Sequence, residues 1–268
     1  MLNKNISYVL SLIEEASNSI DEDFKLNLSR LGISDLPPQI GELSSQQWLS
    51  LQYNKFKKLP IEICKMKSLR FLFLNNNFIS ELPKEFFKLE SLAFLHFNEN
   101  RLRKIPADIG RLKSLFHLGL SDNQLLKLPK EIGDLPSLRH LFIDGNNISQ
   151  LPAEIGNLPC LNTLCLEDNK ITNLPLETKK LVYLKELWIA KNDMNEIPNW
   201  LCDMPRLETL DLRFNNIKKL PGWITRMNME IIWIDKSYSK GINLFGNPLD
   251  AQSVNAIKKG KQALHDIL

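Results

Sequence analysis

Three of the four histidines stand near one another in the chain, and imidazole is a common metal ligand and a proton acceptor near neutral pH. His117 and His140 could converge on one Zn²⁺ if the fold brought their rings together. Further ligands could come from His96, Asp122, Asp144 or Cys165. The same three histidines could instead form a pH switch, or supply neutral amphipathic rings, because no linear zinc-binding spacing accompanies them.

Other catalytic chemistry has no motif in this sequence. The nucleophile elbow GxSxG, the phosphate-binding Walker A sequence, the zinc-protease sequence HExxH and the dinucleotide fingerprint GxGxxG are all missing. The remaining histidine, His265, falls in the C-terminal segment. We therefore predict a non-enzymatic protein without a cofactor. The alternative is a zinc-binding protein or weak metal-dependent hydrolase built on His96, His117 and His140.

A repeated pattern predicts the elements that position these residues. The string L-x-x-L-x-L-x-x-N-x-(I/L)-x-x-L-P-x-x-I-x-x-L returns every 23 residues without an insertion. Its asparagine falls at Asn54, Asn77, Asn100, Asn123, Asn146, Asn169, Asn192 and Asn215. Such a period is typical of a solenoid of stacked coils. We predict one structural domain, with a helical cap over 1–22, nine repeats over 23–229, and an irregular last repeat with a helical cap over 230–268.

Each repeat position has a physical role in this solenoid. The leucines point inward, and stacking buries them on both faces of a coil, which a single coil could not achieve. The asparagine offers a donor and an acceptor to the backbone of the bend after the strand. Proline fixes φ in the irregular convex segment. The glycines after the convex isoleucine suit a tight turn: Gly41, Gly110, Gly133 and Gly156. The fold class is an α/β solenoid with a parallel β-sheet on its concave side.

The repeat resembles the 23-residue LPxxIGxLxxL class of leucine-rich-repeat proteins, which includes plant Ras-group proteins, animal Ras-pathway scaffolds and repeat-only proteins of spirochaete bacteria. The resemblance covers about residues 23–249. The segments 13–16, 26–29 and 246–249 look most like the bacterial repeat-only group. The resemblance implies a horseshoe with helical caps at both ends, and a module that binds other proteins. It does not identify a partner.

Alternation along each strand directs the third, fifth and seventh residues of a repeat to the concave face. Neighbours in one column should lie about 4.8 Å apart, so their rings form one continuous aromatic surface. Its members are Trp48, Phe71, Phe73, Phe94, His96, His117, His140 and Phe142, and Trp188 extends the same face. Exposed aromatic patches usually mark interfaces.

Acidic residues border this surface at the seventh and eighth positions, and we include them in the predicted binding site: Glu99, Asp122, Asp144 and Glu167. A protein or peptide partner with basic and apolar groups would fit such a site. One alternative is that the rings only stack on one another and serve β-propensity. Another is that the surface joins two copies in a homodimer. Basic residues beyond the asparagine are expected to be a solvated edge: Lys57, Lys58, Arg101, Arg103 and Lys104.

Composition limits the partner and the compartment. The formal net charge is +3, which is far from the basic footprint of a nucleic-acid binder, so no nucleic-acid partner is expected. No apolar run approaches the roughly 20 residues that span a bilayer, and the first residues do not form a signal peptide. The four cysteines show no disulfide-cap spacing. We predict a cytoplasmic protein, although unconventional export would leave the same sequence.

Overall fold

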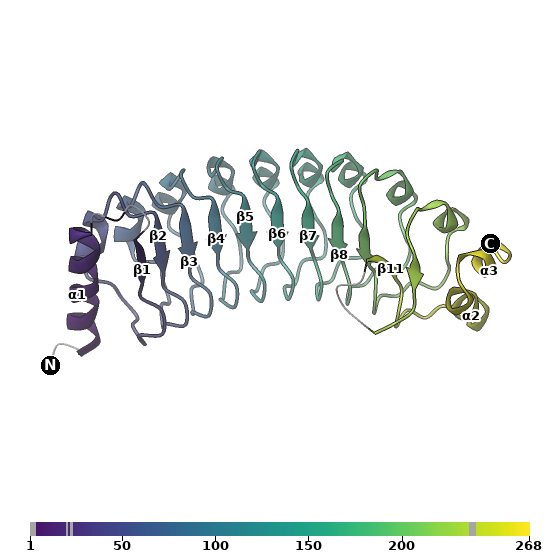
Figure 1. Cartoon of the computed structure of the whole chain (residues 1–268), viewed down its shortest axis with the longest axis horizontal. Helices are drawn as coiled ribbons and strands as arrows, with labels where there is room; N and C mark the ends of the chain where they lie inside the picture. The colour runs from purple at the N-terminus through teal and green to yellow at the C-terminus, as the bar shows by residue number, and fades with distance from the viewer. Residues whose placement is uncertain (1–3, 20, 22–23, 236–239) are drawn as a thin grey trace.

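The chain folds into a curved solenoid whose coils lie side by side, with the two termini at opposite ends (Figure 1). The computed structural model describes residues 4–19, 21, 24–235 and 240–268. Helix α1 (Lys4–Asn18) covers one end, and helices α2 (Ala251–Lys259) and α3 (Lys261–His265) lie at the other.

One parallel sheet runs the length of the described chain. Its 11 strands follow the order β1 to β9, then β11 and β10. The strands are β1 (Lys25–Asn27), β2 (Trp48–Ser50), β3 (Phe71–Phe73), β4 (Phe94–His96), β5 (His117–Gly119), β6 (His140–Phe142), β7 (Thr163–Cys165), β8 (Glu186–Trp188), β9 (Thr209–Asp211), β10 (Ile231–Ile232) and β11 (Gly241–Asn243). The central leucines pair in register, Leu49 with Leu72 and Leu72 with Leu95, and all three are buried. The predicted solenoid with a parallel sheet is therefore confirmed.

The convex side of each coil is a short 3₁₀ helix. These helices are η1 (Pro38–Glu42), η2 (Ile61–Lys65), η3 (Lys84–Lys88), η4 (Ala107–Arg111), η5 (Lys130–Asp134), η6 (Ala153–Asn157), η7 (Leu176–Lys180), η8 (Asn199–Asp203) and η9 (Gly222–Arg226). A proline precedes each of them; Pro106, for example, has φ −62° before η4. Proline suits this position because the N–H that it lacks would have no partner inside the helix.

The four convex glycines lie inside 3₁₀ helices, where the sequence predicted a tight turn. Gly133 and Gly156 do not have a left-handed φ; they lie where one coil packs closely on the next. A Cβ on Gly133 would lie 2.3 Å from the carbonyl oxygen of Glu154, and a Cβ on Gly156 would lie 2.1 Å from that of Glu177. These glycines therefore lie in tightly turned 3₁₀ segments, and the close packing of neighbouring coils gives a further reason for glycine at these positions.

The repeated asparagines are buried and bond the backbone of two coils, as predicted. Nδ2 of Asn123 donates to the carbonyl oxygens of Phe97 and Leu120, at 2.9 and 3.1 Å. Its Oδ1 accepts from the amide of Leu102 at 3.0 Å. Each asparagine thus satisfies backbone groups that the bend would otherwise bury without partners.

The two ends depart from the repeat. In α1, Val9 and Ile13 are buried, and the helix packs on β1 and η1 of the first coil. At the other end the chain crosses over, because β11, not β10, pairs with β9, and β10 lies outside β11. Helix α3 packs on η9 and α2 on β10, so both helices close the last coil.

Candidate interaction surface

The aromatic side chains of β2 to β6 form a continuous strip on the sheet. We call the residues Trp48, Phe71, Phe73, Phe94, His96, His117, His140 and Phe142 the aromatic strip. Phe71 stacks on Phe94 with ring centroids 5.0 Å apart, and Trp48 lies 5.3 Å from Phe73. Every member is partly exposed. The rings therefore do pack on one another, and they also present one apolar surface to solvent.

His117 lies at the centre of the aromatic strip because its neighbour on the strand, Gly119, has no side chain. Glycine interrupts the fifth-position column between His96 and Phe142. The His117 ring contacts both, with centroid distances of 4.5 Å to His96 and 5.0 Å to Phe142. It also contacts His140 at 5.6 Å. One imidazole thus joins the two columns of the strip.

The surroundings of these histidines favour the neutral form. Burial, and then the nearby His96 and His140, lower the pKa of His117 to about 4. Burial also lowers the pKa of His96 and of His140. His140 has a polar partner, since its Nδ1 lies 3.2 Å from the hydroxyl of Thr163, which donates to Glu186 at 3.1 Å. At neutral pH the three rings are uncharged aromatic groups.

The zinc alternative finds no support in this geometry. In residues 4–19, 21, 24–235 and 240–268, no three histidine, cysteine, aspartate or glutamate side chains form a group that could hold a metal ion. The imidazole rings pack on one another at a tilt of 35° to 36°. Burial raises the pKa of the Cys165 thiol, which opposes the thiolate form that binds metal. His96, His117 and His140 belong to the aromatic strip.

A groove with acidic walls continues from the aromatic strip toward the C-terminal coils. Its volume is about 870 Å³, and its apolar lining includes His117, Phe142 and Trp188. We call this the acidic groove, and its carboxylates are Glu99, Asp122, Asp144, Glu167, Glu186 and Glu208. Burial and the neighbouring Asp144 and Glu99 raise the pKa of Asp122, which is the sign of a crowded negative region. The four predicted border acids all line this groove.

The turn after each strand explains how these acids are presented. Glu99, Asp122 and Asp168 each have φ between 53° and 54°, in the left-handed region. The equivalent residue of the next repeat after Asp122 is Gly145, and a Cβ there would lie 2.3 Å from Oδ1 of Asp122. The Asp122 carboxylate therefore occupies space that the absence of a side chain at Gly145 leaves free.

Several side chains differ from the simple alternation rule. Trp188, which the sequence placed on the open face, is only 8% exposed and offers little surface to a partner. Its neighbours in the ladder are Cys165 and Asp211. Phe116 was missed, because it precedes its strand; its ring contacts Phe94 at 5.6 Å and extends the strip. Asn98 was also missed: its Oδ1 accepts from the amide of Ser121 and lines the groove.

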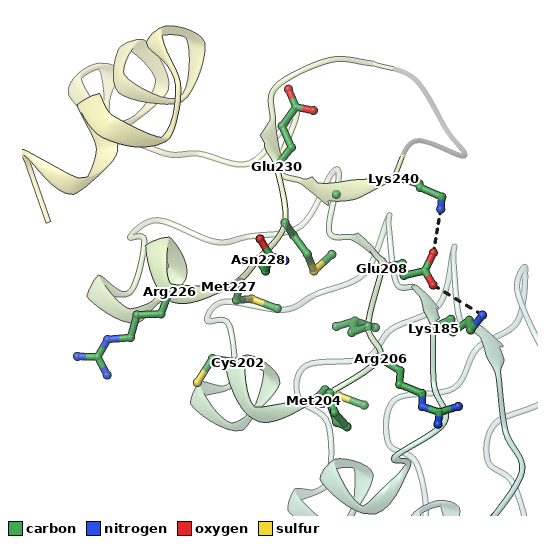
Figure 2. Close-up of a pocket in the computed structure, with 14 residues that line it drawn as sticks. Lys185, Cys202, Met204, Arg206, Glu208, Arg226, Met227, Asn228, Glu230 and Lys240 are labelled. Atoms are coloured by element: carbon green, nitrogen blue, oxygen red, sulfur yellow. Dashed lines mark hydrogen bonds and ion pairs between the residues drawn. The ribbon is translucent and has the colours of Figure 1, made fainter.

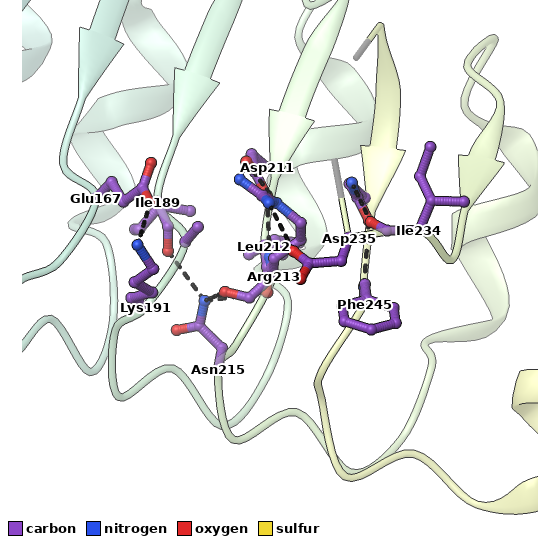
Figure 3. Close-up of polar contacts among 12 residues, drawn as sticks. Glu167, Ile189, Lys191, Asp211, Leu212, Arg213, Asn215, Ile234, Asp235 and Phe245 are labelled. Carbon is purple, nitrogen blue, oxygen red and sulfur yellow. Dashed lines mark hydrogen bonds and ion pairs between the residues drawn. The ribbon is translucent and has the colours of Figure 1, made fainter. Parts of the chain in front are cut away.

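A buried ion pair joins Asp211, the last residue of β9, to Arg213 (Figure 3). The guanidinium of Arg213 donates to Asp211 at 2.8 to 3.0 Å, and their side chains are 6% and 2% exposed. Arg213 also donates to Asp235, which follows β10, at 3.2 Å. Nearby, Lys191 pairs with Glu167 at 2.9 Å and neutralises one acid of the groove. The alternation rule places Asp211 on the open face, but it lies in the ladder between Trp188 and Asn243 and its carboxylate accepts from Arg213.

A second hollow of about 830 Å³ lies where the period breaks (Figure 2). Methionines Met204, Met227 and Met229 line it, and Glu208 bridges Lys185 at 3.7 Å and Lys240 at 2.9 Å. Glu208 and Lys240 line the acidic groove too, so the two hollows meet there. Lys185 and Lys240 therefore offset the charge of Glu208 at the C-terminal end of the acidic groove.

Comparison with known proteins identifies the family. A family model described as leucine-rich repeat region matches residues 62–141. Two further models, both described as leucine rich repeat, match residues 137–158 and 159–217. The chain is therefore a leucine-rich-repeat protein. No curated protein matches its sequence.

Three solved structures place it within this family. A leucine-rich-repeat protein of Leptospira interrogans is 25% identical with a TM-score of 0.57, over 90% of this chain and 76% of that one. The plant peptide hormone receptor RGFR1, in complex with RGF2, is 26% identical with a TM-score of 0.67, over 80% of this chain and 34% of the receptor. An internalin of Listeria monocytogenes is 18% identical with a TM-score of 0.63, over 96% of this chain and 86% of that one, and shows the shared fold. The chain thus spans about a third of the plant receptor's length.

No described helix is both long and apolar enough to cross a bilayer.

Proposed function

We propose that this protein is a non-enzymatic interaction module that binds a protein or peptide along the aromatic strip and the acidic groove. The observation that carries the proposal is the continuity of these two surfaces: His117 and Phe142 belong to the strip and also line the groove. A bound segment could therefore place apolar side chains on the rings and basic ones among the carboxylates.

Physical chemistry favours this assignment over a purely structural role. Burying these partly exposed rings under a partner adds hydrophobic stabilisation, and aromatic residues are frequent centres of binding energy. Asp122, Asp144 and Glu99 repel one another, so a cation between them would relieve that repulsion. The plant peptide hormone receptor with a similar solenoid is in complex with RGF2, which supports peptide recognition by this kind of fold.

Within the leucine-rich-repeat proteins, we also propose a particular class for this chain. The unbroken 23-residue period and the similarity to the Leptospira interrogans protein support membership of the LPxxIGxLxxL class, near the bacterial repeat-only proteins. A cytoplasmic location remains part of this proposal too.

Selection from a random peptide library on the immobilised protein tests the function. We expect enriched peptides to contain aromatic or aliphatic residues beside arginine or lysine. Their affinity should fall at least about tenfold in Phe94→Ser and in an Asp122→Asn, Asp144→Asn double variant. The matched control, Leu176→Ser, removes an equally apolar side chain that is 54% exposed on η7. Peptides that bind all four proteins equally would refute the concave site.

Self-association through the aromatic strip is a competing use of the same surface. Sedimentation of the wild type and of Phe71→Ser over a range of concentrations separates the two. If the wild type dimerises and Phe71→Ser does not, the strip serves self-association. If the wild type is a monomer at every concentration, self-association is excluded and the strip binds a different partner.

A further inference from the structure

Positive charge gathers on an edge of the solenoid that the proposed peptide site does not use. The loops after β2, β3, β4 and β5 run from each ladder asparagine toward the proline, over 55–59, 78–82, 101–105 and 124–128. Together these four loops carry seven basic residues: three in 55–59, three in 101–105 and one in 124–128. Their single acidic residue is Glu81. The matching loops after β6 to β9 carry three basic and two acidic residues. We call the first group of loops the basic edge, and Figure 1 shows these loops side by side along one border.

The charges of the basic edge are available to a partner. Lys57, Lys104 and Lys127 are exposed, and among the described residues no hydrogen bond or ion pair engages their ammonium groups. Lys58 makes the one ion pair seen among the described residues of these loops, at 3.4 Å from Glu81, with both side chains more than half exposed. An exposed pair of this kind contributes little and would exchange easily for an external anion.

Large apolar side chains project from the same edge. Leu126 is 65% exposed and Phe78 is 39% exposed, while Tyr53 at the neighbouring turn is 45% exposed. Folding leaves Leu126 in water although it lies between Leu125 and Leu128, which are buried. Apolar groups set among lysines and arginines are the combination that binds the interface of an anionic bilayer, where charge attracts and the apolar groups insert.

The ring contacts argue against a nucleic-acid ligand on this edge. Single-stranded nucleic acids bind by stacking bases on open aromatic faces. Here Arg101 lies over the Phe78 ring at 4.6 Å, and Arg30 lies over the Tyr53 ring at 4.0 Å. A guanidinium group already covers one face of each ring, and Leu126 has no aromatic face to offer.

We propose that the basic edge docks the protein on an anionic phospholipid surface, with Leu126 and Phe78 inserted at the headgroup level. The four loops are about 5 Å apart, so they span roughly 15 Å and present their charges to one plane. This site lies beyond the asparagine turn, so it leaves the aromatic strip and the acidic groove open to a peptide while the protein is bound to lipid.

Vesicle binding by the full chain tests the proposal. The probes are vesicles of phosphatidylcholine alone, and of equal parts phosphatidylcholine and phosphatidylserine, followed by co-sedimentation at low and high salt. We expect binding to the anionic vesicles that salt weakens, and little binding to the neutral ones. The triple variant Lys57→Gln, Lys104→Gln, Lys127→Gln should bind about a hundredfold more weakly. Leu126→Ser should weaken binding several-fold at both salt concentrations.

A second triple variant provides the matched control. Lys170→Gln, Lys218→Gln, Lys219→Gln removes the same charge from exposed lysines in the corresponding loops of later repeats. It should keep most of the binding. Equal losses in the two triple variants would show a response to net charge alone and would overturn the assignment to this edge, as would the absence of binding to anionic vesicles. Tighter binding to a single-stranded oligonucleotide, lost in the first triple variant, would assign the edge to nucleic acid instead.

Discussion

Single residues in this solenoid act through the coils on either side of them. An outward side chain has neighbours about 4.8 Å away in both directions along the sheet. His117 shows the consequence, since its contacts with His96 and Phe142 depend on the missing side chain at Gly119. The asparagines show it too, because each one bonds the backbone of the preceding coil.

Stability should fall in mild acid because the histidines of the strip are held neutral. The pKa of His117 is lowered to about 4 from 6.5, so the folded form resists protonation that the unfolded chain accepts. The stabilisation is complete above about pH 6.5 and is lost as the pH falls through about 4. Urea denaturation across this interval measures it. His117→Gln should show a flatter dependence on pH, and a slope unchanged by that substitution would contradict the role of His117.

Removing one asparagine of the ladder should cost far more than removing an exposed amide. Nδ2 of Asn146 donates to Leu120, Ile143 and Asp144, each at 3.0 Å, and Oδ1 accepts from Leu125. Asn146→Ala leaves several of these buried groups without partners, at about 3 kcal/mol of unfolding free energy. The comparison is Gln150→Ala, an exposed position in the same repeat. Similar denaturation midpoints for the two variants would refute the ladder.

At the scale of elements, the 3₁₀ helices determine how closely the coils approach on the convex side. Helices η5, η6 and η7 pack directly on one another, with Gly133 and Gly156 at the contacts. The helices are short and the contact is made by backbone atoms, so an added methyl group has no flexible side chain to displace.

Gly156→Ala should therefore destabilise the protein although alanine is the better helix former. The new Cβ would overlap the carbonyl oxygen of Glu177, and overpacking of this kind costs about 1–3 kcal/mol. Gly222→Ala is the matched control in η9, where a Cβ would lie 3.7 Å from its nearest neighbour. Thermal unfolding should show a lower Tm for the first variant and little change for the second. The reverse order would contradict close packing as the reason for glycine.

For the whole molecule, stability is collective and the end caps complete it. Each coil contacts its neighbours along the stack, so an uncovered end exposes a full apolar face. Buried Ile257 of α2 and Leu264 of α3 cover the last coil. At the same end Asp235, which follows β10, contacts Arg213, which follows β9.

Truncation after residue 249 should lower the Tm by several degrees and increase binding of a dye specific for apolar surface. The point variant Leu268→Ser is a suitable control, because Leu268 is 45% exposed. It should behave like the wild type in both measurements. A truncated chain with an unchanged Tm would show that the last coil is stable without its helices.

The sequence by itself determined the parallel solenoid, the inward leucines, the paired asparagines and the aromatic columns, because every repeat places a given position in the same surroundings. Only the tertiary structure decided which outward residues stay accessible. Trp188 and Asp211 obey the repeat yet are buried, and the glycine positions reflect contact between coils. The crossover of β10 and β11 also lies outside any periodic rule. These features depend on the side-chain volumes of adjacent coils and on the irregular last repeat, which occurs once. A pattern that describes one coil contains neither.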